Sequence, residues 1–221
     1  MSFLNIFNCK INLTGKIQRN IMKVAVIGAT GTIGKAIVNL LGKEDYEIIE
    51  SSRNVEPKVD IDKPESIEKY YNKIGKVDAI ICAAGIANFG SLQELTDQQF
   101  QRGIQSKLMG QVNLVRKGIS NLNDNGVFVL TSGMLAKKPW PKTSAVAMVN
   151  AGLEGFTRAA ALDLPDNKRI CIVSPPLISE TAEKMRMDTD PWPGAEKVAI
   201  AYLQTITGDS NGEVVYVEGY N

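Results

Sequence analysis

The sequence of 221 residues contains no histidine. This absence excludes every Ser-His, Cys-His and histidine–metal mechanism, because each needs an imidazole to move a proton or to bind the metal. Cysteine is scarce as well, and the three cysteines are scattered. They form neither a disulfide framework nor a zinc spacing, so no metal is predicted. Cys82 and Cys171 lie in apolar runs, which favours buried free thiols and a cytoplasmic protein.

Strong net charge and long apolar runs are also missing. The formal net charge of +1 gives no electrostatic argument for nucleic acid or an anionic membrane surface as a partner. No apolar run approaches the roughly 20 residues that span a bilayer. With 44% apolar and 22% charged residues, the chain is predicted to be globular, with neither nucleic acid nor membrane as a partner.

Residues 1–21 differ in composition from the rest of the chain. They contain no acidic residue, carry Lys10, Lys16 and Arg19, and show a loose amphipathic pattern. An organelle transit peptide and a surface helix both fit this pattern, although a single arginine weakens the transit interpretation. Because Met22 immediately precedes the first predicted strand, we favour an upstream start codon or a nonessential extension, followed by one domain over residues 22–221.

From Met22 onward, predicted strands and helices alternate. This order is typical of a single-domain α/β fold, a Rossmann-type doubly wound parallel sheet. Seven strands are predicted, at residues 23–28, 46–52, 58–61, 77–83, 126–131, 169–174 and 213–217. Helices are predicted at residues 32–42, 64–74, 97–121, 145–163 and 194–206. Thr96 and Gln99 have the spacing of a capping box at the start of the longest helix.

A glycine-rich turn joins the first predicted strand to the first predicted helix. The unpaired N–H groups of a helix N-terminus favour an anion, and glycines permit a tight turn and close approach of a pyrophosphate. An unliganded strand–helix turn is the alternative interpretation. The sequence predicts a dinucleotide site whose loop residues are Gly28, Thr30, Gly31, Thr32, Ile33 and Gly34.

The next predicted strand ends at Ser52 and Arg53. In an open parallel sheet, ligands bind beyond the carboxyl ends of the strands. An acidic residue at this point would bind a ribose 2′-hydroxyl, whereas an arginine beside small hydroxyl residues suits a 2′-phosphate. We therefore favour NADP(H) over NAD(H) as the cofactor. A solvated surface arginine is the alternative.

Two further strand ends carry candidate cofactor residues. Asp60 and Ile61 follow the third predicted strand, where an adenine could sit. Ala83, Ala84 and Gly85 follow the fourth, where small residues let a cofactor lie against the backbone. Tight helix–strand packing would also explain these small residues.

Six motifs of the chain occur in a common order and spacing: Gly28–Gly34, Asp60–Asp62, Ala83–Gly85, Leu153–Leu164, Val173–Pro175 and Val217–Gly219. Together they resemble the short-chain dehydrogenase/reductase superfamily, from about Met22 to the C-terminus. The resemblance implies a Rossmann-type fold of seven parallel strands and a nicotinamide dinucleotide. It also implies a homodimer or homotetramer built on the long helices.

The catalytic positions depart from the pattern that the resemblance implies. That pattern is a Tyr-x-x-x-Lys pair, a preceding serine and a helix asparagine. Here the tyrosine falls on Val146, the lysine on Asn150 and the serine on Gly133, with Ser132 one residue earlier. The asparagine falls on Lys107. Since valine transfers no proton, the sequence predicts an atypical member without the usual pair.

Three residues are candidates to replace the missing chemistry. Lys107 could act as a substitute acid, because desolvation can pull the pKa of a lysine toward neutrality. Asn150 and Ser132 could polarise a carbonyl. The alternatives are that Lys107 points to solvent and that Asn150 merely pairs with backbone groups.

The loop after the sixth predicted strand departs from the family as well. Pro175-Pro176 stands in place of the family's Pro-Gly, and a proline can neither flex nor donate as a glycine would. Ile178 and Ser179 are predicted to border the nicotinamide, and Pro175 is a further candidate for cofactor binding.

Two functions follow from these features. The first is an atypical NADP(H)-dependent oxidoreductase acting on a small carbonyl or alcohol substrate, since hydride transfer belongs to the cofactor and the protein supplies binding and orientation. The second is a catalytically silent NADP(H)-binding sensor or structural subunit. An isomerase or epimerase is disfavoured, because it would still need a proton-transfer residue.

Overall fold

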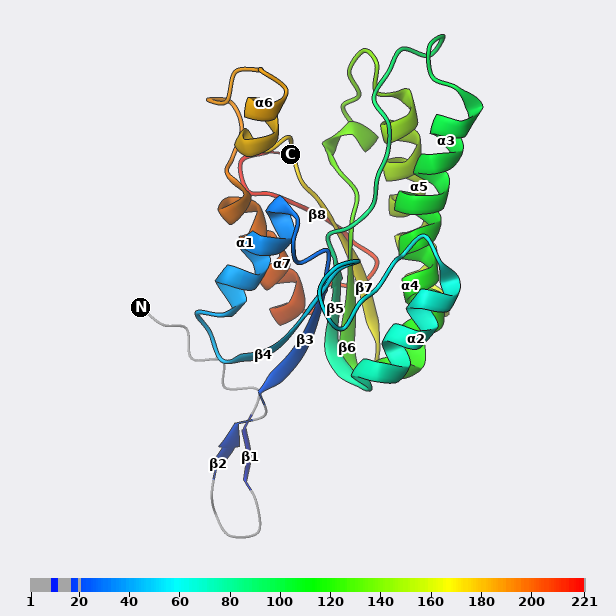
Figure 1. Ribbon diagram of the computed structural model, residues 1–221. Coiled ribbons are helices and arrows are strands. Elements are labelled where there is room, and N and C mark those ends of the chain that lie inside the picture. The colour runs from blue at the N-terminus through cyan, green and yellow to red at the C-terminus, as the bar shows by residue number, and fades with distance from the viewer. Residues whose placement is uncertain (1–8, 12–16, 20, 221) are drawn as a thin grey trace.

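Six short apolar segments form the central sheet of the computed structural model, which describes residues 9–11, 17–19 and 21–220 (Figure 1). The strand order is β4-β3-β5-β6-β7-β8, and all neighbours are parallel. The inner strands are mostly buried and supply the near-continuous apolar runs that burial on both faces needs, whereas the two edge strands are only partly buried. The strands are β3 (Met22–Ile27), β4 (Tyr46–Ser51), β5 (Val77–Cys82), β6 (Leu122–Thr131), β7 (Arg169–Ser174) and β8 (Val214–Tyr216).

Helices cover both faces of this sheet (Figure 1). On one face, α1 (Thr32–Leu41) packs beside α7 (Ala195–Thr207) over an apolar cluster. On the other face lie α2 (Pro64–Ile74), α4 (Gly110–Gly118) and α5 (Ser144–Asp163), over a second cluster. The doubly wound α/β prediction is therefore confirmed.

The predicted helix over residues 97–121 is continuous but changes its winding. It begins as α3 (Asp97–Gly103), with the predicted capping box of Thr96 and Gln99 in place. A π-helix (Ile104–Met109) follows before α4, and the segment ends in a 3₁₀ turn (Ile119–Asn121).

Smaller elements complete the chain. A 3₁₀ turn (Met134–Ala136) follows β6, and the short helix α6 (Ser179–Lys184) precedes α7. Near the N-terminus, β1 (Cys9–Ile11) pairs antiparallel with β2 (Ile17–Arg19) in a separate sheet.

The described part of the N-terminal extension thus consists of strands, not of the surface helix considered from the sequence. Lys16 lies outside the described residues, and the division at residue 22 stays a prediction. No described helix has both the length and the apolar composition that crossing a bilayer requires. The cytoplasmic assignment stays a prediction as well. The expectation for Cys82 and Cys171 is confirmed, since both are buried free thiols.

The prediction of seven strands is wrong by one, because residues 58–61 form a loop. Val59 and Ile61 are buried in the core. However, the N–H of Asp60 donates to Ser66 Oγ (2.9 Å), and the N–H of Asp62 donates to the Asp60 carboxylate (3.2 Å). In a strand these two N–H groups would donate to the backbone of a neighbouring strand, but here they donate to side chains. Residues 58–61 therefore do not extend the sheet, and β4 remains its edge strand.

The chain changes direction across the sheet at β3. From β3 it passes to β4 on one side and then to β5 on the other. The loops after β3 and β5 therefore diverge, and they leave the crevice where open α/β sheets bind ligands. The N–H of Gly28 donates to Ser51 O (2.8 Å) and that of Ala83 to Ile27 O (2.8 Å), so the three strand ends lie together.

Gly118 provides a test of the packing between α2 and α4. A Cβ at Gly118 would overlap Tyr71 Oη, and buried Tyr71 is held by its hydrogen bond to Leu114 O (2.8 Å). We expect Gly118→Ala to lower the free energy of unfolding by about 1–3 kcal/mol, despite the better helix propensity of alanine. A Cβ at Gly103 would make only ordinary contacts at 3.5 Å. Gly103→Ala should therefore be neutral or stabilising by up to about 1 kcal/mol. Urea unfolding of both variants measures the difference, and equal stabilities would contradict this account of the packing.

Candidate functional site

The turn from β3 into α1 is built on close backbone contacts. Gly28 has a φ of +90°, and a Cβ there would stand 2.7 Å from Ala83 O. A Cβ on Gly34 would overlap the carbonyl oxygen of Gly28. Gly31 is the N-cap of α1, no side chain caps it, and the first turn carries no acidic residue. The backbone N–H groups of the first turn of α1 lie at the positive end of the helix dipole and therefore suit an anion such as a pyrophosphate.

Two pockets meet at the carboxyl end of the sheet. The first has a volume of about 220 Å³ and the second about 250 Å³. Ala83, Ala84 and Gly85 line both. One elongated ligand can therefore extend from the first pocket into the second along this wall, as a dinucleotide would.

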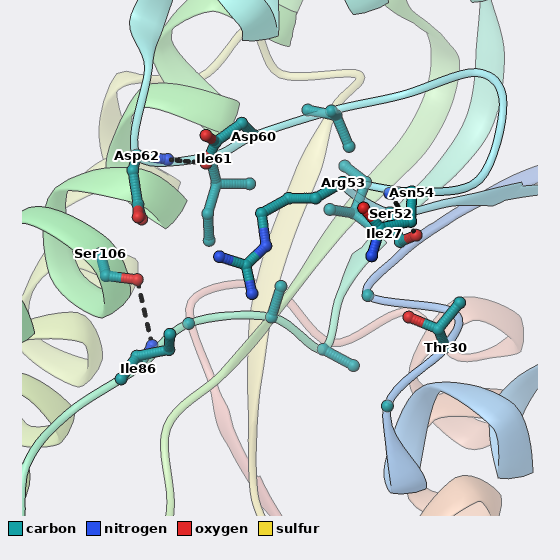
Figure 2. A pocket seen from close by; sticks show the side chains of 16 residues that line it. Ile27, Thr30, Ser52, Arg53, Asn54, Asp60, Ile61, Asp62, Ile86 and Ser106 are labelled. Carbon is teal, nitrogen blue, oxygen red and sulfur yellow. Dashed lines mark hydrogen bonds between the residues drawn. The ribbon is translucent and has the colours of Figure 1, made fainter.

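Polar side chains shape the first pocket. Figure 2 shows the guanidinium of Arg53 directed into the space bordered by Ile61 and Thr30. Beside it, Ser52 Oγ accepts hydrogen bonds from the N–H groups of Asn54 and Val55 (both 3.1 Å). These bonds fix the turn that carries Arg53. A guanidinium beside a hydroxyl suits a phosphate group.

The far wall of the first pocket is tied to α3 and the π-helix. Asp62, which lines the pocket, forms an ion pair with Arg102 (2.7 Å). Ser106 Oγ accepts a hydrogen bond from the N–H of Ile86 (3.1 Å), as Figure 2 shows. The first contact ties the loop after β4 to α3, and the second ties the segment after β5 to the π-helix.

Lys107 is the only ionisable side chain among the described residues that line the second pocket. It lies on the π-helix, and its Nζ donates a hydrogen bond to Ser132 O (2.8 Å). Burial lowers the pKa of Lys107 to about 8, because desolvation disfavours the ammonium form. The Lys107 amine therefore lies at the pocket, not in bulk solvent.

Ser132 and Asn150 lie beside Lys107 but use their polar atoms differently. Ser132 Oγ donates its one proton to Glu154 Oε1 (2.9 Å), so Ser132 presents its carbonyl to Lys107 and its hydroxyl to α5. Asn150 Nδ2 donates to Gly133 O (3.4 Å), while its buried Oδ1 has no hydrogen-bond partner. Since buried polar atoms normally have a partner, this Oδ1 is an acceptor whose hydrogen bond the protein alone does not supply.

No tyrosine is among the described residues that line the second pocket. Val146 lines it, one turn of α5 before Asn150. Tyr70 and Tyr71 are buried in α2, and Tyr202 is buried in α7. Among the described residues of the pocket, therefore, none supplies a phenol that could donate a proton.

The structure gathers most of the residues predicted from the sequence at the two pockets. The first pocket holds Gly28, Thr30, Gly31, Ser52, Arg53, Asp60 and Ile61, and the second holds Ile33, Lys107, Ser132, Asn150 and Pro175. Thr32, Gly34 and Ile178 line neither pocket. Ile178 is buried in the apolar cluster beneath α1 and α7, and its neighbour Leu177 faces the second pocket instead.

Several lining residues were not found from the sequence. Phe89, Met134, Trp140 and Met185 line the second pocket, and all but Met134, in a 3₁₀ turn, come from loops without regular structure. Apolar residues in loops show no periodicity, so no pattern marked them. The isolated tryptophan between Pro139 and Pro141 was the one available signal.

Comparison with known proteins gives consistent matches along the chain. Residues 43–200 match the family described as Enoyl-(Acyl carrier protein) reductase. The protein lin1944 from Listeria innocua is 39% identical, with a TM-score of 0.83 over 89% of this chain and 99% of that one. A small-chain dehydrogenase in complex with NADPH is 27% identical, with a TM-score of 0.81 over 91% of this chain and 98% of that one.

Curated relatives match over a shorter region. Versicolorin reductase 1 from Aspergillus parasiticus is 28% identical over 171 residues, which cover 66% of this chain and 65% of that protein. Versicolorin reductase stcU from Emericella nidulans is 26% identical over the same shares. The chain thus spans less than two thirds of the length of these relatives.

Proposed function

Since the chain belongs to the short-chain dehydrogenase/reductase superfamily, we propose that it is an atypical NADP(H)-dependent reductase of a small carbonyl compound, with Lys107 as its proton donor. The fold of this superfamily binds a nicotinamide cofactor, and the glycine turn and shared pocket wall fit one. The observation that carries the proposal is the position of Lys107, whose amine is the one ionisable group among the described residues of the second pocket.

Each residue of the site has a defined task in this reaction. The reduced nicotinamide supplies a hydride when bound. Lys107 Nζ holds the proton for the carbonyl oxygen, and its hydrogen bond to Ser132 O orients the amine. Asn150 Oδ1 accepts a hydrogen bond from a ligand hydroxyl, which gives this buried atom its missing partner. In this proposal Val146 and Asn150 occupy the positions at which the superfamily's tyrosine and lysine act.

Arg53 supports NADP(H) as the cofactor. It lies with Ser52 at the end of β4, where an acidic residue would select a 2′-hydroxyl. A structural relative was determined in complex with NADPH. The arginine provides the charge-assisted hydrogen bonds that a 2′-phosphate requires.

A second candidate function is a silent NADP(H)-binding sensor. The hydrogen bonds of Ser132 favour it, because the hydroxyl is committed to Glu154 and the carbonyl to Lys107. In that case the pocket binds the cofactor without passing a proton to a substrate. Cofactor binding without NADPH oxidation over a panel of carbonyl compounds and quinones would favour this function over the reductase.

Lys107→Met tests the proton donor. The wild-type kcat/KM for carbonyl reduction should fall as pH rises through about 8, because the Lys107 ammonium form is then lost. The variant should not show this pH dependence. Its kcat/KM should also be about 10²- to 10⁴-fold lower, which is the usual contribution of general acid catalysis. Lys69→Met, at an exposed position of α2, is the matched control and should behave as wild type. An unchanged pH profile in Lys107→Met would remove Lys107 from the mechanism.

Arg53→Ala tests the cofactor preference by calorimetry. A charge-assisted hydrogen bond contributes about 1.5–3 kcal/mol, so the Kd for NADPH should rise roughly 10- to 100-fold. NADH serves as the matched ligand control, since it lacks the 2′-phosphate and its Kd should stay unchanged. An equal loss of affinity for NADPH and NADH would show that Arg53 contributes to binding of both cofactors and does not select the 2′-phosphate.

We propose further that the chain forms a homodimer or homotetramer through α5. Met148 and Leu162 are exposed at 42% and 87% on this helix, although both are large and apolar. Burial in a symmetric interface would remove both from water. Light scattering should show a multimer for the wild type and a smaller species for Leu162→Lys. A wild-type monomer at micromolar concentration would refute the interface.

A further inference from the structure

Both tryptophans of the chain lie together at the second pocket. Trp140 lines the pocket, and Trp192 packs against it with ring centroids 5.5 Å apart. Trp140 comes from the segment between β6 and α5, and Trp192 from the segment between α6 and α7. The pair therefore joins two loops that are distant in sequence at the edge of one cavity.

The backbone of Trp140 is held in place by two hydrogen bonds with the side chain of Thr143. Its N–H donates to Thr143 Oγ1 (3.0 Å), and the same hydroxyl donates to Trp140 O (2.6 Å). Thr143 is buried as the N-cap residue of α5. The indole is thus presented to the pocket by a rigid loop, as a recognition surface requires.

Two further large apolar side chains line this pocket while remaining exposed. Phe89 is 51% exposed and Met185 is 43% exposed. They come from the segment after β5 and from the end of α6. Exposed apolar groups gathered around a concave site mark a surface for an apolar ligand, and methionine sulfur contacts aromatic rings favourably.

Charge in the second pocket is confined to Lys107. No arginine and no acidic residue is among the described residues that line it. A carboxylate substrate would ordinarily be bound by the forked donors of an arginine. A single amine, already bonded to Ser132 O, suits one neutral carbonyl oxygen instead. The volume of about 250 Å³, part of which the nicotinamide end of the cofactor would take, is below the roughly 300–1,000 Å³ of drug-sized sites, so the substrate is small.

We propose that the second pocket takes a small, uncharged aromatic ketone or aldehyde, with its ring against Trp140 and its carbonyl oxygen toward Lys107 Nζ. This substrate class rests on the proposed reductase function. The carbonyl carbon accepts a hydride and forms a C–H bond, while the C–H bond of the reduced nicotinamide breaks and NADPH is oxidised to NADP⁺. The π-electron pair of the carbonyl moves to oxygen, which takes the proton from Lys107. Solvent then reprotonates Lys107, and the product is an aromatic alcohol.

A matched set of ketones tests this specificity with the full chain and NADPH. The set is acetophenone, its ring-saturated counterpart cyclohexyl methyl ketone, and the charged 4-acetylbenzoate. We expect kcat/KM for acetophenone to exceed that of the saturated ketone by about two- to tenfold, given the strength of aromatic pairs. The charged 4-acetylbenzoate should also be reduced less well, because no arginine is among the described residues of the second pocket to bind its carboxylate. Trp140→Leu should abolish the roughly two- to tenfold preference over the saturated ketone. Met187→Ala, two residues beyond Met185 and outside both pockets, should leave it unchanged.

Binding is measured separately from turnover. Because the two tryptophans form one pair, quenching of their fluorescence with NADP⁺ present reports ligand entry. Selective binding of acetophenone without reduction would support the ligand class and overturn the reductase function. Equal reduction of both neutral ketones, or a preference unchanged in Trp140→Leu, would overturn the aromatic specificity alone. Reduction of a 2-enoyl thioester with no ketone bound would also overturn it.

Discussion

The close approach of backbones at the end of β3 is the constraint on which the whole site depends. Gly28 lies against the carbonyl of Ala83, and Gly34 lies against the carbonyl of Gly28. No side chain fits at either point, so the turn, the start of α1 and the end of β5 form one rigid unit. Residues of this unit line both pockets. The pocket proposed for the cofactor and the pocket proposed for the substrate therefore depend on the same rigid backbone segment.

The elements of this fold could be predicted where local physics decides them. Apolar β-branched runs marked the six strands of the sheet, and capping and periodicity marked the major helices. Residues 58–61 show where such reasoning fails. Their apolar side chains are buried as in a strand, yet the N–H of Asp60 is taken by Ser66 Oγ. Pairing depends on a neighbour that the sequence does not reveal.

The site divides in a similar way. Strand ends and the glycine turn were predictable, because a parallel sheet places them on one edge. The direction of single side chains was not. The hydroxyl of Ser132 points to Glu154, and the side chain of Ile178 points into the core. In both cases the direction is set by contacts with residues that are distant in the sequence. Loop residues such as Trp140 reach the pocket only through the tertiary fold.

The π-helix that carries Lys107 has a consequence for how this site could diverge. A π-turn holds one more residue than an α-turn, so removal of a single residue there would restore regular winding. Each residue of an α-helix turns the chain by roughly 100°, and Lys107 would then rotate away from Ser132 while its identity stayed the same. Among related chains, the length of the segment Ile104–Met109 would therefore decide whether a lysine faces the pocket. An insertion or deletion in this segment would therefore gain or lose the amine at the pocket as effectively as a substitution of Lys107 itself.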